Sequence, residues 1–307
     1  MSEAKDINFM GGRKIAAFLS IALIVISLGS LIFQGLKLGL DFTGGTLIEV
    51  AYESSADVNS IREDLVAAGY KDVAVQHFGS EEDVLVRMQE AYRADLGDEV
   101  LSTLRANTDE DIQLRRSEFV GSQVGEELRD DGGIAMLLAL AVVMIYVAAR
   151  FQFKFSVGAV AALMHDVIIV LGIFSLLQID FDLNVLAALL AVIGYSLNDT
   201  IVVSDRIREN FRIIRQMQAI DIVNRSLTNT LGRTLVTSLT TLLVLLALLF
   251  VGGESIHNFA LALTIGVVVG TYSSIYVASN ILLAMNITRD DLLPPEEEED
   301  PELAERP

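Results

Sequence analysis

Long blocks of apolar residues constrain this chain more than any other feature of its sequence. A helix that crosses the hydrocarbon core of a bilayer needs about 20 mostly apolar residues. Blocks near that length occur six times, which predicts six transmembrane helices. They cover residues 15–33, 132–149, 156–177, 183–203, 234–251 and 259–285.

The composition supports a membrane protein. Apolar residues make up 52% of the 307 residues, and the mean hydropathy is +0.50, whereas a soluble domain usually carries more charge. The chain has no Cys, which excludes disulfides and Cys-ligated metals, and its three His make a His-rich metal site unexpected. We therefore expect neither a metal nor a cofactor.

The first apolar block is too long for a cleaved signal peptide, which has a shorter core followed by small residues. We expect it to be retained as an anchor, with residues 1–14 as a cytoplasmic N-terminus.

Basic residues predict the orientation, because cytoplasmic loops are enriched in Lys and Arg. If six spans alternate, all the basic segments between spans fall on one side, whereas loops 178–182 and 252–258 carry no Lys or Arg. Both termini are thus expected in the cytoplasm and residues 36–131 outside. The basic residues are Arg13, Lys14, Arg150, Lys154, Arg206, Arg208, Arg212, Arg215 and Arg225.

The net charge of −19 is concentrated in two segments. Residues 36–131 hold 22 acidic and 9 basic residues, and residues 288–307 hold 9 acidic and 2 basic ones. This acidity argues against nucleic-acid binding, which requires a basic surface. Residues 288–307 contain Pro294-Pro295 and a run of acids, which predicts a disordered cytoplasmic tail.

Residues 36–131 show their own periodicity, which predicts a βαββαβ order, the ferredoxin-like arrangement. The fold class expected is an α-helical polytopic membrane protein with one extracytoplasmic α+β domain between the first two spans, followed by five spans within residues 132–287. The predicted elements of this domain are strand 46–52, helix 57–69, strands 73–78 and 84–88, helix 91–106 and strand 111–120.

Three polar positions interrupt the spans: His165-Asp166, Asn198-Asp199 and Arg233. An ionisable side chain in the hydrocarbon costs about 2.5–3.5 kcal/mol on insertion scales, so each position calls for an explanation. Asp199 nears the cytoplasm as the fourth span descends, and Arg233 leaves it as the fifth rises. The two residues could therefore lie at similar depth on neighbouring helices.

A carboxylate near a guanidinium could act as a proton switch, because moving Arg233 relative to Asp199 would bind or release a proton. Thr237, Thr240 and Thr241 share a helix face with Arg233, which predicts a polar stripe facing protein or water. A purely structural ion pair, or an Arg233 that reaches the headgroups, is the alternative. For His165-Asp166, a polar link between helices and a functional role both stay open.

Two aspartates on adjacent spans, Asp166 and Asp199, are also what an intramembrane aspartyl protease needs. Such enzymes share a Gly-x-Gly-Asp motif, but Ser196-Leu197-Asn198 precedes Asp199 here, so we expect no enzyme. Gly44-Gly45 lacks the helix and Lys of a phosphate loop.

Four passages together resemble the SecF family of bacterial protein-export membrane subunits, which belongs with SecD to the resistance–nodulation–division superfamily. They are Gly39-Leu40-Asp41-Phe42-Thr43-Gly44-Gly45-Thr46 at the start of the outer domain, Leu163-Met164-His165-Asp166 in the third span, Ile193 through Asn210 in the fourth, and Leu231-Gly232-Arg233-Thr234 in the fifth.

The resemblance implies a subunit that pairs with SecD and uses inward proton flow to help draw a translocating polypeptide outwards. It implies a proton path through Asp199 and Arg233, with Asp166, His165 and Asn198 as further candidates, and an outer motif of Gly39, Asp41, Phe42, Gly44 and Gly45. The implied partners are SecD, the SecYEG translocon, YajC, the translocating polypeptide and the lipids of the cytoplasmic (inner) membrane. A stand-alone proton-driven exporter of small molecules or lipids is the alternative, since it would share the buried charges.

Overall fold

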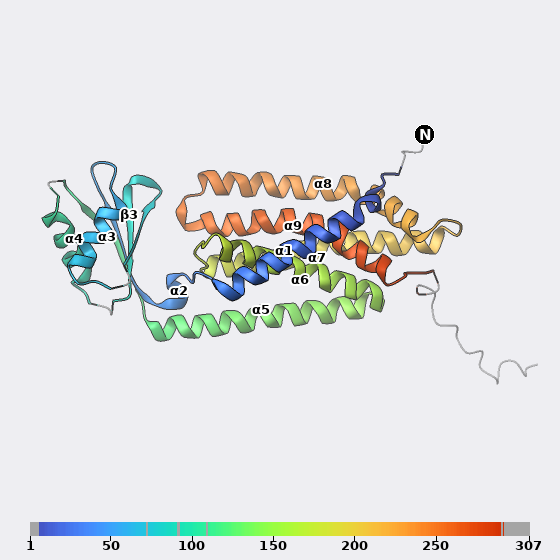
Figure 1. Ribbon diagram of the computed structural model, residues 1–307, viewed down its shortest axis with the longest axis horizontal. Coiled ribbons are helices and arrows are strands. Elements are labelled where there is room, and N and C mark those ends of the chain that lie inside the picture. Colours follow the sequence, from blue (N-terminus) through green and yellow to red (C-terminus); the bar gives the residue numbers. More distant parts are fainter. Residues whose placement is uncertain (1–5, 72, 91–92, 109, 290, 292–307) are drawn as a thin grey trace, which may run out of the picture.

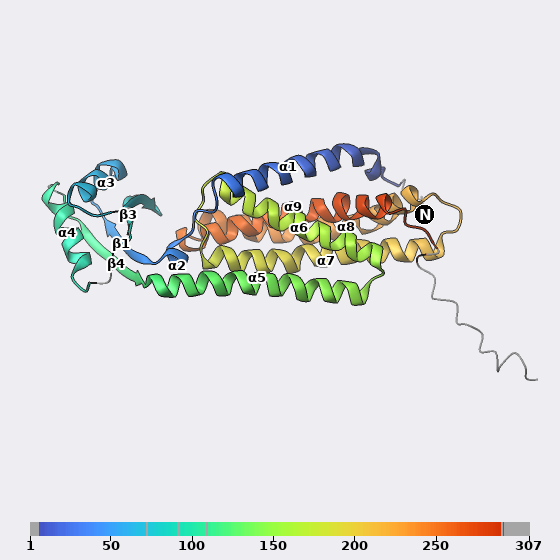
Figure 2. The same cartoon turned by 60° about the horizontal axis from the view of Figure 1, so that its bottom comes forward.

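The computed structural model describes residues 6–71, 73–90, 93–108, 110–289 and 291. It has two parts, an elongated bundle of long helices and a small sheet domain at one end of that bundle (Figure 1). A view turned by 60° shows the same separation (Figure 2). Most of the predicted acidic tail lies outside the described residues.

Six helices within the described residues are long and apolar enough to cross a membrane, so the predicted helical class is confirmed. A 3-10 helix, Phe9–Gly12, leads into the first of them. The six are α1 (Arg13–Phe33), α5 (Ser122–Arg150), α6 (Phe153–Leu176), α7 (Leu183–Ile213), α8 (Ala219–Val251) and α9 (Glu254–Ala284).

Three helices, α5, α7 and α8, extend by at least ten residues beyond the apolar blocks that predicted them. Residues 122–131, expected in the outer domain, form the first turns of α5, and the expected loop after residue 203 is helical on both sides of a short turn at residues 214–218. Charged residues are compatible with a helix, and pairs one turn apart such as Arg206–Glu209, at 2.6 Å, support it. An apolar block therefore marks the part of a helix inside the hydrocarbon, not its ends.

The sheet domain has the predicted βαββαβ order. Its strands form one antiparallel sheet in the order β2-β3-β1-β4. Its elements are β1 (Gly45–Ala51), α3 (Val58–Ala67), β2 (Ala74–Phe78), β3 (Ser80–Met88), α4 (Leu96–Ala106) and β4 (Gln113–Val120).

Two boundaries in this domain differ from the prediction. The prediction that a polar turn continues up to residue 84 is wrong, because β3 already begins at Ser80. The hairpin turns at Gly79, whose φ of +82° suits glycine. Helix α4 begins at Leu96, and the expected start at Ala91 and Tyr92 lies outside the described residues.

Alternate residues of the sheet give it two different faces. Ile48, Val50 and Val86 are fully buried in the core shared with α3 and α4. Leu47 and Arg87 lie on the opposite face, which looks toward the end of the bundle (Figure 1). A short helix, α2 (Leu40–Thr43), connects α1 to β1.

Helix α9 is the central helix of the bundle and packs against α6, α7 and α8. Glycines allow α7 to approach it closely: a Cβ at Gly266 would lie 2.1 Å from Val192, and one at Gly270 would lie 3.1 Å from Ser196. Helices α1 and α5 lie at the edge of the bundle and expose large apolar side chains, as expected of lipid-facing surfaces.

We expect Gly172→Ala to destabilise the bundle by about 1–3 kcal/mol, the usual cost of overpacking. A Cβ at Gly172 in α6 would lie 2.6 Å from the backbone Cα of Ser27 in α1. The control is Gly133→Ala in α5, where a Cβ has no neighbour within 4 Å. Thermal unfolding of the detergent-solubilised protein measures both, and equal midpoints would contradict the close α1–α6 contact.

Candidate functional site

The carboxylate of Asp166, in the middle of α6, is fully buried and has partners on three helices. His165 Nδ1 lies 2.9 Å from its Oδ1, and Ser273 Oγ of α9 donates to its Oδ2 at 2.7 Å. Ser196 Oγ of α7 donates to the same oxygen. Asp166 therefore joins α6 to α7 and α9 through hydrogen bonds made in a low-dielectric interior.

His165 extends this polar centre toward α1. Its ring stacks on Tyr272 of α9 with the centroids 6.1 Å apart. The Tyr272 hydroxyl donates to Ala16 O at 2.8 Å and lies 3.0 Å from Ser20 Oγ, both in α1. The two residues thus form a polar link between helices, which is one of the roles left open by the sequence.

Asp199 forms a second buried centre, on α7. Its side chain is 8% exposed. Thr234 Oγ1 of α8 donates to Oδ1 at 2.7 Å, and Ser274 Oγ of α9 donates to Oδ2 at 2.5 Å. No Lys or Arg nitrogen among the described residues lies within 4.0 Å of this carboxylate.

The two centres are adjacent on α9, because Ser273 serves Asp166 and the next residue, Ser274, serves Asp199. On α7, Ser196 and Asp199 lie about one turn apart. Each carboxylate has its own set of hydroxyl donors. The two carboxyl groups thus lie in one helix interior, and the described residues contain no cluster able to hold a metal ion.

The predicted ion pair between Asp199 and Arg233 is absent from the described structure. Arg233 does lie beside Asp199 in depth, because the next residue, Thr234, bonds to Asp199. Successive helical residues point about 100° apart, so facing Thr234 toward Asp199 turns Arg233 outward. Its side chain is exposed on the outer surface of α8. Asn198 is turned outward from α7 for the same reason.

The hydroxyls of the threonine stripe beside Arg233 bond within their own helix, and the expectation that the stripe faces protein or water stays a prediction. Thr237, Thr240 and Thr241 each donate to a carbonyl one turn back in their own helix, at 2.8–3.0 Å. These hydroxyls are therefore satisfied in any surroundings. Arg233 differs from them in keeping a charged group exposed on that face.

The sequence did not single out four side chains that donate hydrogen bonds to Asp166 or Asp199: Ser196, Thr234, Ser273 and Ser274. Ser196 and Thr234 lie within the passages that resemble the SecF family. Ser273 and Ser274 continue the small-residue face that begins at Gly266 and Gly270, at helical spacing, and that continuity was the available signal.

The outer motif contacts α7 directly. Asp41 Oδ2 accepts from the backbone N–H of Leu183 at 3.0 Å, beside the capping side chain of Asp182, whose Oδ1 accepts from Val185 N at 2.8 Å. Gly39 N donates to Phe181 O at 2.8 Å. Phe42 is buried and stacks on Phe181 with the centroids 5.9 Å apart.

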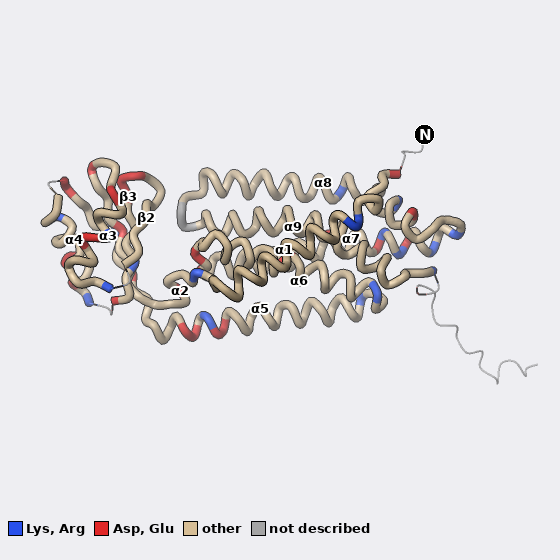
Figure 3. The backbone as a smooth tube through the Cα atoms, in the orientation of Figure 1, with Lys and Arg blue, Asp and Glu red and all other residues tan. Residues whose placement is uncertain are grey.

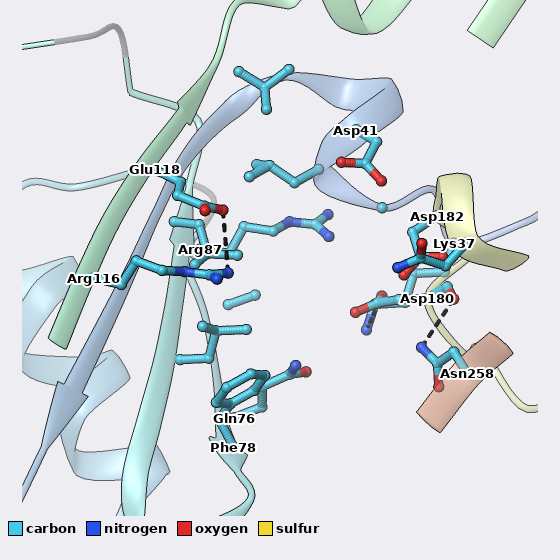
Figure 4. Close-up of a pocket in the computed structure, with 17 residues that line it drawn as sticks. Lys37, Asp41, Gln76, Phe78, Arg87, Arg116, Glu118, Asp180, Asp182 and Asn258 are labelled. Atoms are coloured by element: carbon cyan, nitrogen blue, oxygen red, sulfur yellow. Dashed lines mark hydrogen bonds and ion pairs between the residues drawn. The ribbon is translucent and has the colours of Figure 1, made fainter. Parts of the chain in front are cut away.

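A cleft of about 260 Å³ separates the open face of the sheet from the outer ends of the helices (Figure 4). Arg87 and Arg116 enter it from the sheet, and Asp41, Asp180 and Asp182 lie across from them. Arg116 pairs with Glu118 at 3.2 Å, and Asp180 pairs with Lys37 at 2.8 Å. Both walls of this cleft therefore carry charges of both signs.

Two family models match the chain. Residues 100–288 match the one described as protein export membrane protein SecD/SecF, C-terminal, and residues 29–56 match the SecD/SecF GG motif. The chain is 53% identical over 291 residues to the protein translocase subunit SecF of Pseudomonas aeruginosa, covering 94% of this chain and 95% of that relative. It is 50% identical over 307 residues to the SecF of Vibrio alginolyticus, covering 99% and 98%.

Among solved structures, the chain is similar to SecDF, a translocon-associated membrane protein from Thermus thermophilus, with a TM-score of 0.85 and 38% identity. The match covers 93% of this chain but 39% of that SecDF chain. A SecDF structure in a super-membrane-facing form matches with a TM-score of 0.70 over 92% of this chain.

We expect Asp182→Asn to stabilise the chain increasingly as pH rises above about 4. Burial raises the pKa of Asp182, and the nearby Asp41 carboxylate raises it further. The hydrogen bond from Val185 N lowers the pKa but does not outweigh burial. An acid with a raised folded-state pKa loses its proton first in the unfolded state, so stability falls as pH rises through that window. Asn keeps the helix cap but cannot ionise.

Thermal unfolding between pH 4 and pH 7 measures this effect. The melting temperature of the variant minus that of the parent should grow with pH. A difference that stays constant over this range would contradict the raised pKa.

Proposed function

Because the chain belongs to the SecD/SecF family of protein-export membrane proteins, we propose that it couples inward proton flow to a late step of polypeptide export. It does so as an accessory subunit of the Sec translocase, together with a SecD partner. The six spanning helices and the SecF relatives make it a multi-pass protein of the inner membrane.

Asp199 is the observation that carries this proposal. A buried carboxylate without a cationic partner is costly, and taking up a proton removes that cost. Both hydroxyl partners, Thr234 and Ser274, can donate to the ionised form, and each can also accept from the protonated form. The two hydroxyls can therefore bond to the carboxyl group in both states of a proton carrier.

Arg233 is the residue whose charge decides whether Asp199 is ionised or protonated. Arg stays charged at physiological pH, so it tunes the proton carrier without carrying the proton. Its position next to Thr234 means that a rotation of α8 exchanges a hydroxyl for a guanidinium beside Asp199. That exchange favours the ionised carboxylate and releases the proton.

Asp166 and His165 hold the neighbouring helices together while Thr234 and Arg233 exchange places beside Asp199. Asp166 has three partners on α6, α7 and α9, and His165 stacks on Tyr272, which bonds to α1. We propose no enzymatic role, because aspartyl proteolysis needs two carboxylates that share a proton, and Asp166 and Asp199 have separate donor sets.

A partner helix packs on the exposed face of α7. Ala187, Ala191, Gly194 and Asn198 follow one helix face and are exposed, and a Cβ at Gly194 has no neighbour within 4 Å. Lipid-facing positions are usually large and apolar, whereas small residues favour close helix packing. Since the chain matches 39% of the SecDF chain, a SecD-like partner fits this face.

The ferredoxin-like domain lies on the outer side of the membrane. Lys and Arg gather at the end of the bundle opposite the sheet domain (Figure 3). We infer that this end is cytoplasmic, because cytoplasmic loops are enriched in Lys and Arg, and that both termini lie on that side of the membrane. The outer domain then faces the emerging polypeptide beside the SecYEG translocon.

We expect Asp199→Asn to abolish the response of export to a proton gradient, because an amide cannot take up the proton. Export of a precursor into inverted membrane vesicles, with and without an uncoupler, measures it. Asp205→Asn is the matched control, since Asp205 lies on the same helix but pairs with Arg208 at 2.8 Å near the cytoplasmic end. An unchanged response in Asp199→Asn would remove this residue from the proton path.

We expect Gly194→Leu to disrupt assembly, because a large side chain blocks close approach of a partner helix. Co-purification of a SecD-like chain measures this effect. The control is Gly133→Leu on α5, which also has open space but sits among large exposed apolar side chains. If both variants retain the partner, the α7 face is not the contact, and a chain that purifies alone while pumping protons would favour a stand-alone exporter.

A further inference from the structure

The connections between the outer domain and the helices are short. Only Gly44 separates α2 from β1, and only Gly121 separates β4 from α5. Few rotatable bonds are therefore available for the domain to turn independently of the bundle.

The two connections also touch. A Cβ at Gly44, whose φ is +69°, would lie 2.6 Å from the Cα of Ser122 at the start of α5. A Cβ at Gly45, whose φ is +125°, would lie 2.6 Å from Met88 O in β3. The paired glycines thus allow backbone to pack on backbone at the point where the chain enters the domain.

The entering segment is bonded to the turn that precedes α7. Leu38 and Phe181 form an isolated parallel bridge, in which Phe181 N donates to Lys37 O at 2.8 Å. The side chains of Lys37 and Asp180 form an ion pair at 2.8 Å next to this bridge. Asn258, in the first turns of α9, donates to Asp180 O at 3.2 Å.

Asp41 extends the attachment to α7 itself, through its bond to Leu183 N. The sheet holds the same segment from the other side, since Arg87 of β3 donates to Leu38 O at 3.3 Å. Figure 4 shows the Arg87 side chain reaching across the cleft toward Asp41. Residues 37–44 are therefore held by the sheet, by the turn and by the first turn of α7.

We propose that residues 37–44 are a rigid joint that transmits the position of the outer domain to α7, with Asp41 as its positioning residue. This inference rests on the proton coupling proposed above. Helix α7 is continuous from Leu183 to Ile213, and Asp199 lies about 24 Å along it from the joint at 1.5 Å per residue.

A displacement of the outer domain then moves Asp199 against its partners on α8 and α9. The bonds from Thr234 and Ser274 are 2.7 and 2.5 Å long, so a shift of about 1 Å along the α7 axis is enough to weaken them. The reverse also holds: a change in the protonation of Asp199 shifts α7, and the joint passes that shift to the sheet domain. Asp41 acts on the proton carrier through the helix, without touching it.

An engineered disulfide tests whether the joint stays closed during the cycle. The chain has no Cys, so Lys37→Cys with Asp180→Cys introduces a single pair. Neighbouring strands lie about 4.8 Å apart, which is within the Cα separation that a disulfide spans. We expect oxidation of this pair, in an otherwise unchanged chain assembled with its partner, to leave the gradient response of export intact.

Asp41→Ala should remove most of the gradient response, because the joint loses its bond to α7. Oxidising the Cys pair in the same chain should restore the response, and a reductant should remove it again. This rescue separates transmission from mere stability. Asp57→Ala is the control, since Asp57 also caps a helix, α3, through Asn59 N at 2.9 Å, but lies away from the joint.

Hydrogen–deuterium exchange over residues 183–190 provides a readout independent of export. Exchange should rise in Asp41→Ala and fall again on oxidation. A disulfide that blocks export in the otherwise unchanged chain, or an Asp41→Ala response that oxidation does not restore, overturns the joint. An unchanged response in Asp199→Asn would instead overturn the proton coupling, and the exchange measurement would still decide whether Asp41 fixes the start of α7.

Discussion

Hydrogen bonds from two adjacent serines of α9 to two buried carboxylates organise the membrane part of this protein. A carboxylate in a low-dielectric interior needs donors, and Ser273 and Ser274 supply them to Asp166 and Asp199. Short side chains can do so only if the helix backbones approach closely. Gly266 and Gly270 permit that approach to α7, so the close packing and the polar site are one feature of the sequence.

The two carboxylates differ in their burial and in the number of hydrogen-bond partners that hold them. Asp166 is fully buried and bonded to three groups on three helices, whereas Asp199 is bonded to two hydroxyls and is slightly exposed. A fully satisfied centre resists rearrangement, and a centre with fewer, neutral partners can exchange them. The fold therefore places a fixed polar centre and an adjustable one side by side, as the proposed proton carrier requires.

Sequence reasoning found the elements of this site but not their orientation. Apolar blocks predicted the helices, and the insertion cost of charge singled out Asp166, Asp199 and Arg233. Periodicity cannot say how far a helix is rotated about its axis, because packing sets that angle, and so the sequence left open whether Arg233 faces Asp199 or turns outward. Contacts between residues far apart in the sequence, such as Asp41 with Leu183, carry no local signal at all.

Helix α7 connects the outer motif, the buried Asp199 and an exposed helix face. Its first turn is held by the outer motif, Asp199 lies within it, and its exposed face carries Asn198 at membrane depth. Asn198 on α7 and Arg233 on α8 are polar groups that lipid cannot hydrogen-bond. In the isolated chain both side chains are exposed, so each helix has a polar position that calls for a partner. A partner that covers these groups would restrain the same helix that the outer domain is proposed to move. Assembly would then set the energy required for α7 to shift, because polar groups buried at that contact must find new partners with each displacement.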